Sequence, residues 1–260
     1  MKRFLQKKIS LSLSLVLILV TMGGTWGITY LNVQPEEVSA VSAEPAETVQ
    51  MQYDDAVKDS MTVEENEILP LVSLEKGAPY AKYDEEGRVL LVNFNKYPES
   101  YPEGQDVALS WGNIWAFNVA ELADWYADHG KEVTDWPTRI RQLLGLAPDN
   151  DYTHFTAMWV EPEDVERPAY VQDTGTVEMT DYLTENVDED FREWFDDNII
   201  WCYFDGAYPW TRLGYTYDWA DNGEEYGLSE FLVKEDSRVK VEYTVTIEEL
   251  IAMLEAGTCQ

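Results

Sequence analysis

The chain has 260 residues, of which 45% are hydrophobic, and its formal net charge is −32. This length allows one or two domains, and the apolar fraction is sufficient for a core and argues against wholesale disorder. So acidic a surface repels phosphate backbones, which disfavours nucleic acid as a partner and favours solubility or attraction to cations. With only two histidines there is no imidazole cluster for a transition metal, so no cofactor is expected.

Residues 1–40 have the pattern of an export signal. A basic end precedes an uncharged stretch, 9–35, whose most apolar part is Leu11–Val20. Two outcomes remain open. Signal peptidase could cleave after Ala40 or Ala43, or the apolar run could stay as a membrane anchor. Either outcome predicts an extracytoplasmic protein, which is secreted, periplasmic or anchored to the membrane with its domain outside.

An acidic segment follows the apolar run. Residues 34–67 contain ten acidic residues but only one base, Lys58, and one aromatic residue, Tyr53. Such a composition buries too little apolar surface to offset the entropy of ordering the chain. We therefore expect a disordered acidic linker over 41–67, followed by a single globular domain over 68–260.

Short periodic segments fill residues 68–260. Alternating apolar residues predict strands, and Asn118 and Thr246, each followed three residues later by Glu, indicate reciprocal caps at two helix starts. The predicted strands are 80–83, 88–94, 107–111, 153–160, 199–204, 211–217, 227–233 and 238–245, and the predicted helices are 118–129, 135–144, 187–195 and 246–254. This irregular order predicts an α+β domain in which three to four helices pack on an antiparallel or mixed sheet.

Residues Trp201–Trp219, the aromatic segment, contain eight aromatic residues among nineteen. Aromatic faces beside a few charged groups suit the recognition of a sugar or a peptide. The alternative is that two neighbouring strands supply large core residues. The candidate ligand-binding residues are Trp210, Arg212, Tyr215, Tyr217, Asp218, Trp219 and Glu230.

Charged groups near the aromatic segment allow an enzymatic alternative. Arg212 needs a carboxylate or an aromatic face, and Asp218 and Glu230 are its nearest candidate partners in the sequence. A glycan hydrolase needs only two suitably spaced carboxylates, which leave no sequence motif. Its candidate residues are Asp205, Asp218 and Glu230.

Two further features concern metal binding and cysteine pairing. The loop Asp221–Glu225 gathers oxygen donors around a glycine, which makes it the best calcium candidate, although it lacks EF-hand spacing. Cys202 and Cys259 are the only cysteines, and in an oxidising compartment they are candidates for a disulfide that would pin the C-terminus to the domain.

Four segments resemble a group of exported bacterial proteins of uncharacterised function. These segments are 139–146 (RIRQLLGL), 161–168 (EPEDVERP), 208–219 (YPWTRLGYTYDW) and 227–231 (GLSEF). The resemblance covers about half the chain and implies export and a shared domain. It implies no activity, so it assigns no catalytic residue.

Three function classes remain. The first is a non-catalytic module of the cell envelope or the exterior that binds glycan, peptide or protein through an aromatic-rich surface. The second is a carboxylate-based glycan hydrolase, and the third is a structural or inhibitory interaction protein. A deep cleft with two facing carboxylates would favour the hydrolase, and a shallow aromatic ledge would favour the binding module.

Overall fold

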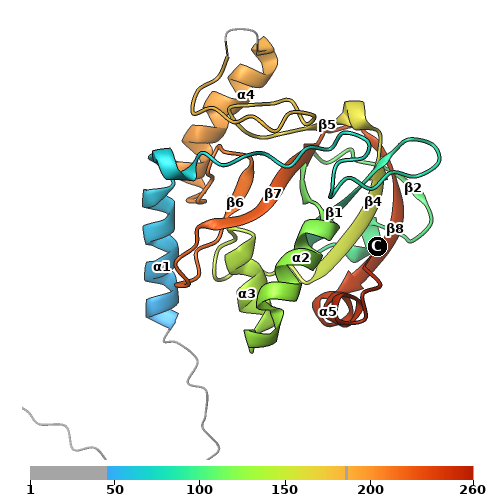
Figure 1. The fold of residues 1–260 in the computed structure, drawn as a ribbon, viewed down its shortest axis with the longest axis horizontal. Helices are drawn as coiled ribbons and strands as arrows, with labels where there is room; N and C mark the ends of the chain where they lie inside the picture. The colour runs from blue at the N-terminus through green and yellow to red at the C-terminus, as the bar shows by residue number, and fades with distance from the viewer. Residues whose placement is uncertain (1–45, 185–186, 260) are drawn as a thin grey trace, which may run out of the picture. The chain divides into compact units, whose positions relative to one another are not determined.

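A computed structural model of the chain describes residues 46–184 and 187–259. Within these residues the protein is an α+β domain with five α-helices and an eight-stranded antiparallel sheet (Figure 1). The α+β class predicted from the sequence is confirmed, and one helix is added to the three to four expected. None of the helices described is both long and apolar enough to cross a bilayer. The predicted signal or anchor over 1–40 lies outside the described residues.

The strands follow the order β2-β8-β4-β1-β3-β7-β5, and β6 pairs with β7 beyond the end of β5. The strands are β1 Val89–Asn95, β2 Asp106–Ala108, β3 Ile114–Phe117, β4 His154–Val160, β5 Val165–Glu166, β6 Tyr215–Tyr217, β7 Tyr226–Val233 and β8 Arg238–Thr246. The helices are α1 Ala46–Asp59, α2 Val119–His129, α3 Trp136–Leu143, α4 Glu189–Ile200 and α5 Ile247–Glu255.

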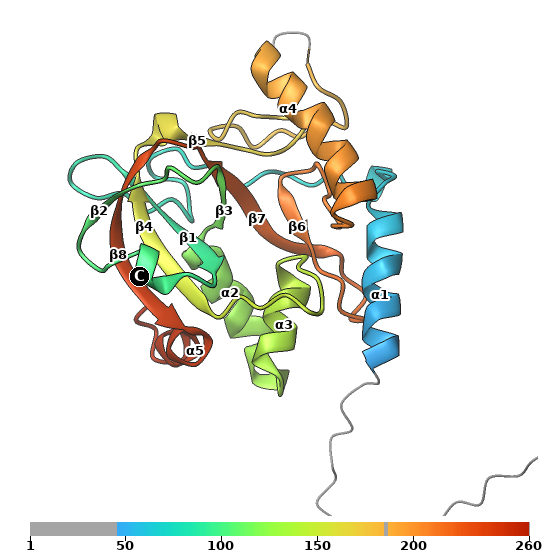
Figure 2. The ribbon, with the colours of Figure 1, turned by 180° about the vertical axis from the view of Figure 1, so that it is seen from behind.

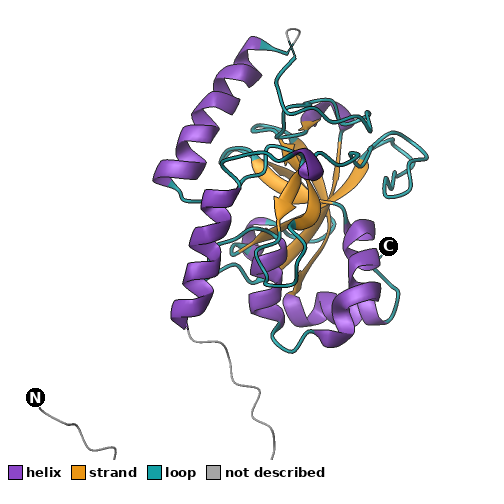
Figure 3. Cartoon of the chain, turned by 60° about the vertical axis from the view of Figure 1, so that its left-hand side comes forward, coloured by secondary structure: helices purple, strands orange, loops and turns teal. Residues whose placement is uncertain are grey.

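Three helices cover one face of the sheet. Their apolar stripes include Leu122 of α2, Ile140 of α3 and Leu250 of α5, which belong to one buried cluster with residues of β1, β3, β4 and β7. Local signals start each helix. The side chains of Asn118, Asp135 and Thr246 accept hydrogen bonds from backbone N–H groups in the first turns of α2, α3 and α5. Figure 3 shows these helices outside the strands.

The opposite face of the sheet has a second buried cluster, to which no α-helix of the described chain contributes. Residues of the central strands, among them Val89, Met158 and Phe231, pack there against loop residues Leu74, Tyr101 and Leu109. The curl of the strands and these loops therefore close this side of the core (Figures 1 and 2).

Strands β1 and β3 pair at a single point, between Val92 and Phe117. On its other edge, β1 pairs with β4 along its whole length, over seven residue pairs, and β3 pairs with β7 over four. The amide of Asn93 donates to the Trp115 carbonyl at 2.8 Å across the widening gap. The divergence of these two strands creates the space in which the candidate site lies.

Helix α1 lies in the segment that was predicted to be a disordered linker, so that prediction is wrong for these residues. Within 41–67, residues Ala46–Asp59 are helical rather than disordered, and Tyr53, Ala56 and Val57 are buried. The Tyr53 ring meets Trp219 edge-on, with centroids 5.6 Å apart. Both views of the ribbon show α1 beside β6 (Figures 1 and 2). The prediction failed because the many acidic residues of this segment drew attention away from its apolar helical stripe. The stripe consists of Val49, Tyr53, Ala56 and Val57, at spacings of four, three and one.

Several other expectations about secondary structure are wrong. The strand predicted over 80–83 is only an isolated bridge between Tyr83 and Val89, and the strand predicted over 211–217 is limited to β6. Residues 199–204 were predicted as a strand, but α4 continues to Ile200 and then widens into a π-helical turn, Trp201–Asp205. Only the Asn118 half of the expected reciprocal cap of α2 is present. The Glu121 carboxylate instead accepts hydrogen bonds from the hydroxyl and backbone N–H of Ser229. Strand β3 was not predicted.

The predicted Cys202–Cys259 disulfide is not formed. Both cysteines are free and buried. Cys202 packs among Phe191, Phe195 and Trp210, whereas Cys259 packs against α5 in the cluster beneath the sheet. Since the two thiols lie in separate clusters, the C-terminus is held by packing rather than by a covalent bridge.

Replacing Tyr53 with Ala should lower the free energy of unfolding by about 3 kcal/mol, because it removes an aromatic ring from a buried contact. Thermal unfolding of the full-length chain would measure this. Met51→Ala, on the exposed side of the same helix, serves as the control and should leave the melting temperature nearly unchanged. Equal melting of Tyr53→Ala and the parent would show that α1 does not pack.

Thiol titration should find two reactive thiols per chain in denaturant without reductant, because neither cysteine is paired. In the native protein neither thiol should react quickly. Burial raises the pKa of the Cys202 thiol to about 12, and the reactive species is the thiolate. A count of zero free thiols in denaturant would show that the two cysteines form a disulfide after all.

Candidate functional site

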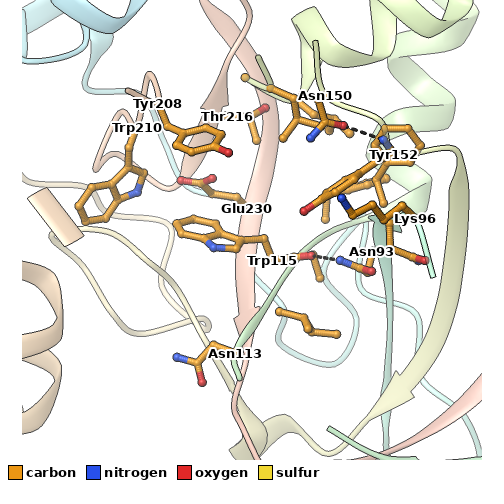
Figure 4. Close-up of a pocket in the computed structure, with 18 of the residues that line it drawn as sticks. Asn93, Lys96, Asn113, Trp115, Asn150, Tyr152, Tyr208, Trp210, Thr216 and Glu230 are labelled. Carbon is orange, nitrogen blue, oxygen red and sulfur yellow. Dashed lines mark hydrogen bonds between the residues drawn. The ribbon is translucent and has the colours of Figure 1, made fainter. Parts of the chain in front are cut away.

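A pocket of about 380 Å³ lies where β1 and β3 diverge. Strand β1 supplies one wall, β3 and β7 supply another, and β6, the loop after α3 and the chain around the π-helical turn complete it. The labelled lining residues in Figure 4 are Asn93, Lys96, Asn113, Trp115, Asn150, Tyr152, Tyr208, Trp210, Thr216 and Glu230. This volume suits one residue-sized group of a larger ligand.

Aromatic side chains form much of the pocket surface. Trp115 and Trp210 meet edge to face at 6.4 Å, and Trp201 stacks on Tyr208 at 5.1 Å. Several lining aromatics remain accessible: Trp115 is 37% exposed, Trp201 49% and Trp111 51%. Trp111, Trp115 and Trp201 therefore form an accessible aromatic rim around the pocket.

Most asparagines in the pocket already make hydrogen bonds within the protein. Asn95 bonds the Thr156 hydroxyl and the Tyr97 backbone, and the side-chain oxygens of Asn113 and Asn150 accept from backbone N–H groups. Asn93 differs: its amide nitrogen donates to the Trp115 carbonyl, but its buried side-chain oxygen has no partner. That oxygen is free to accept a hydrogen bond from a ligand.

Glu230 is the buried acid of the pocket. It lies on β7 opposite Phe117 of β3, is 6% exposed, and one of its carboxyl oxygens has no hydrogen-bond partner. Figure 4 shows its carboxyl between the rings of Trp210, Tyr208 and Trp115. Burial raises the pKa of this carboxyl well above its usual value, while the Trp210 indole and the charge of Arg167 act in the opposite direction.

The pocket lining holds one acid and one base among the residues described. The base, Lys96, bonds Asp151 at 3.0 Å and lies close to solvent. Of the carboxylates predicted for a hydrolase, only Glu230 lines the pocket. Asp205 is exposed, and Asp218 is paired with Arg139 at 2.9 Å. No pair of facing carboxylates therefore exists in the described pocket.

The structure divides the predicted ligand-binding residues into two groups. Trp210, Tyr217 and Glu230 line the pocket. Tyr215, Asp218, Trp219 and Arg212 are buried outside it. The indole N–H of Trp219 donates to the Leu146 carbonyl, and its ring packs on α1. Three of the seven candidate residues therefore line the pocket and four lie outside it.

Arg212 has a structural role. Its guanidinium donates to the Ser60 carbonyl at 2.8 Å and to the Tyr170 hydroxyl at 2.9 Å, and it lies over the Tyr170 and Tyr203 rings. Neither Asp218 nor Glu230 is its partner. The residue adopts φ = 61°, a strained conformation for a residue other than glycine, which the side-chain contacts maintain.

Other side chains of the aromatic segment hold the chain that follows α1. The Tyr203 hydroxyl also donates to the Ser60 carbonyl at 3.0 Å, and the Tyr215 hydroxyl donates to the Glu67 carbonyl at 3.0 Å. The Tyr217 hydroxyl donates to Asp59 at 2.9 Å. These tyrosines of the aromatic segment thus fasten the end of α1 and the chain after it to the domain.

One acidic group in the described chain has the spacing of metal ligands: oxygens of Asp59, Glu67 and Glu225 lie within 4.8 Å of one another. It shares only Glu225 with the predicted calcium loop, Asp221–Glu225. Calcium binding stays an untested prediction. Exposed acids commonly gather in this way without an ion, and the Tyr217 hydroxyl already satisfies one oxygen of Asp59.

The sequence reasoning missed the pocket residues that come from β1 and β3, above all Asn93 and Trp115. A usable signal was present. Asn93 interrupts the apolar run Val89–Phe94, where a buried amide needs a specific partner. Trp115 lies in a four-residue strand that was too short to recognise.

No protein-family model, curated protein sequence or solved structure matches this chain. The resemblance to exported bacterial proteins stays a prediction, and the function has to be argued from the pocket itself.

Replacing Arg212 with Ala should lower the free energy of unfolding by about 3 kcal/mol, because it breaks two buried hydrogen bonds and removes stacking on two rings. Arg212→Gly should be more stable than Arg212→Ala by about 1 kcal/mol, since glycine adopts a positive φ without strain. Urea unfolding would measure both. Unchanged stability of both variants would indicate a ligand-binding role for Arg212 instead.

Proposed function

We propose that this protein is a non-catalytic binding module whose site is the pocket between β1 and β3. The pocket receives one residue-sized group of a larger ligand, such as a glycan or a peptide of the cell envelope. The observation that carries the proposal is an accessible aromatic rim above a pocket of about 380 Å³ that ends in buried, unpartnered polar atoms.

The shape of the site supports a pocket rather than the flat aromatic ledge considered from the sequence. Trp111, Trp115 and Trp201 at the rim would contact the outer part of the ligand, while Trp210 and Glu230 lie deeper and are buried. Rigid aromatic side chains give large contact areas at a low entropic cost, which favours tight packing of a single group.

The hydrolase is the weaker candidate. Both mechanisms of glycoside hydrolysis in which two enzyme carboxylates act require them to flank the scissile bond, and the described lining contains one. The proposal of an exported, extracytoplasmic protein continues to rest on residues 1–40. Attachment through an uncleaved N-terminal segment would hold the pocket at the membrane surface.

Soluble peptidoglycan fragments, which contain both sugars and peptides, provide the test. Added to the full-length chain, they should change the tryptophan fluorescence, because Trp111, Trp115, Trp201 and Trp210 line the site. Trp115→Ala should weaken binding by about tenfold or more, as the loss of a central aromatic contact does.

Trp219→Ala is the matched control, because Trp219 lies outside the pocket. This variant should lower the melting temperature and leave the affinity of the folded protein unchanged. Loss of binding in Trp219→Ala together with normal binding by Trp115→Ala would contradict the proposed site.

A further inference from the structure

The pocket contains two buried acceptors that the protein leaves without partners. One is the side-chain oxygen of Asn93 on β1, and the other is a carboxyl oxygen of Glu230 on β7. A buried polar atom without a partner costs free energy, so a site that retains two of them is adapted to an occupant that bonds them. A hydrogen-bond donor on an occupant would satisfy such an acceptor.

The charge around the pocket favours a cationic ligand over an anionic one. The protein carries a formal net charge of −32, and the one lining base, Lys96, is engaged by Asp151 near solvent. An anion would meet Glu230 and the negative field of the whole protein. A cation would meet the Glu230 carboxylate and the electron-rich faces of aromatic rings.

The apolar character of much of the lining suits a single polar head better than a sugar ring. A sugar ring presents several hydroxyls that each need a partner, whereas Asn95 and the side-chain oxygens of Asn113 and Asn150 already bond other parts of the chain. The remaining surface includes Phe94, Ile114, Leu144 and Leu146, which suit a methylene chain. One polar head on an apolar stem matches this distribution.

Resting on the proposed function, we infer that the pocket binds the alkylammonium side chain of a peptide, with Glu230 as its counter-ion. The rings of Trp115, Tyr208 and Trp210 surround the head group, and the apolar wall contacts the stem. Lysine and related diamino acids have this chemistry.

Binding of this kind is linked to pH. Burial raises the pKa of the Glu230 carboxyl in the empty pocket, so its neutral form persists to a higher pH than in a free glutamate. An ammonium ion favours the carboxylate and displaces the proton. Affinity for the cation therefore rises with pH and levels off above the pKa of the empty state. A neutral ligand that bonds the protonated carboxyl would show the opposite trend.

The groups that face Glu230 do not titrate between pH 5 and 8. Arg167 stays charged, since burial lowers its pKa only to about 10. The Cys202 thiol has a pKa raised to about 12, and burial also raises the pKa of the Tyr208 hydroxyl. Burial also raises the pKa of Glu121, which accepts hydrogen bonds from the neighbouring Ser229, so loss of the pH dependence in Glu230→Gln is the result that assigns it to Glu230.

The test compares Nα-acetyl-lysine methylamide with the norleucine analogue, which lacks the amine, on the full-length chain. The lysine probe should bind at least about tenfold more tightly at pH 8, and its advantage should shrink as the pH falls. Glu230→Gln should abolish the preference and melt normally. Glu224→Gln removes an equal charge from an exposed position and should retain the preference.

Other results would overturn the inference in distinguishable ways. Equal binding of the lysine and norleucine probes would contradict the cation while leaving the pocket as a binding site. A preference for glucosamine over glucose that exceeds the lysine preference would assign the amine to a glycan instead. If no probe perturbs the tryptophan fluorescence, the proposed function fails as well.

Discussion

Strands β1 and β3 lie side by side in the sheet but form only one residue pair, between Val92 and Phe117. A pair of strands that stops pairing leaves backbone groups that need other partners, and the Asn93 amide supplies one to the Trp115 carbonyl. The pocket depends on this opening. If the strands paired along their whole length, the Asn93 side chain would have no gap to bridge, and the sheet would close over the space beside Glu230.

The depth of the pocket follows from the elements that surround the opening. Helices α2, α3 and α5 cover one face of the sheet, and the loop after α3 reaches the edge of the pocket with Gly145 at φ = 65°. A side chain at Gly227 on β7 would collide with the Leu143 carbonyl, so only glycine allows α3 to approach this closely. The chain around the π-helical turn adds Trp201, Tyr208 and Trp210. Such turns are frequent at functional sites.

Much of the fold could be predicted because its signals are local. Helix caps at Asn118, Asp135 and Thr246 and the alternation in Arg238–Thr246 need only neighbouring residues to be recognised. Helix α1 was missed because its buried stripe is short and surrounded by acids. Residues 199–204 were misassigned because their apolar side chains suit a strand equally well, and only the continuation of α4 decides the outcome.

The site was predictable only in part. The aromatic segment was recognised, and Trp210, Tyr217 and Glu230 do line the pocket. Sequence reasoning could not separate these residues from Arg212, whose decisive contact is a backbone carbonyl far away in the chain, at Ser60. Residues of similar chemistry thus took different roles because of tertiary contacts that no local pattern encodes.

The two hydrogen bonds to the Ser60 carbonyl have a mechanical consequence. Arg212 and Tyr203 hold this carbonyl from the same stretch of chain that supplies Trp201, Tyr208 and Trp210 to the pocket wall. A displacement of α1 therefore has to break these two hydrogen bonds or move that stretch of chain with it. The Tyr53–Trp219 contact fastens the helix to a residue outside the pocket as well.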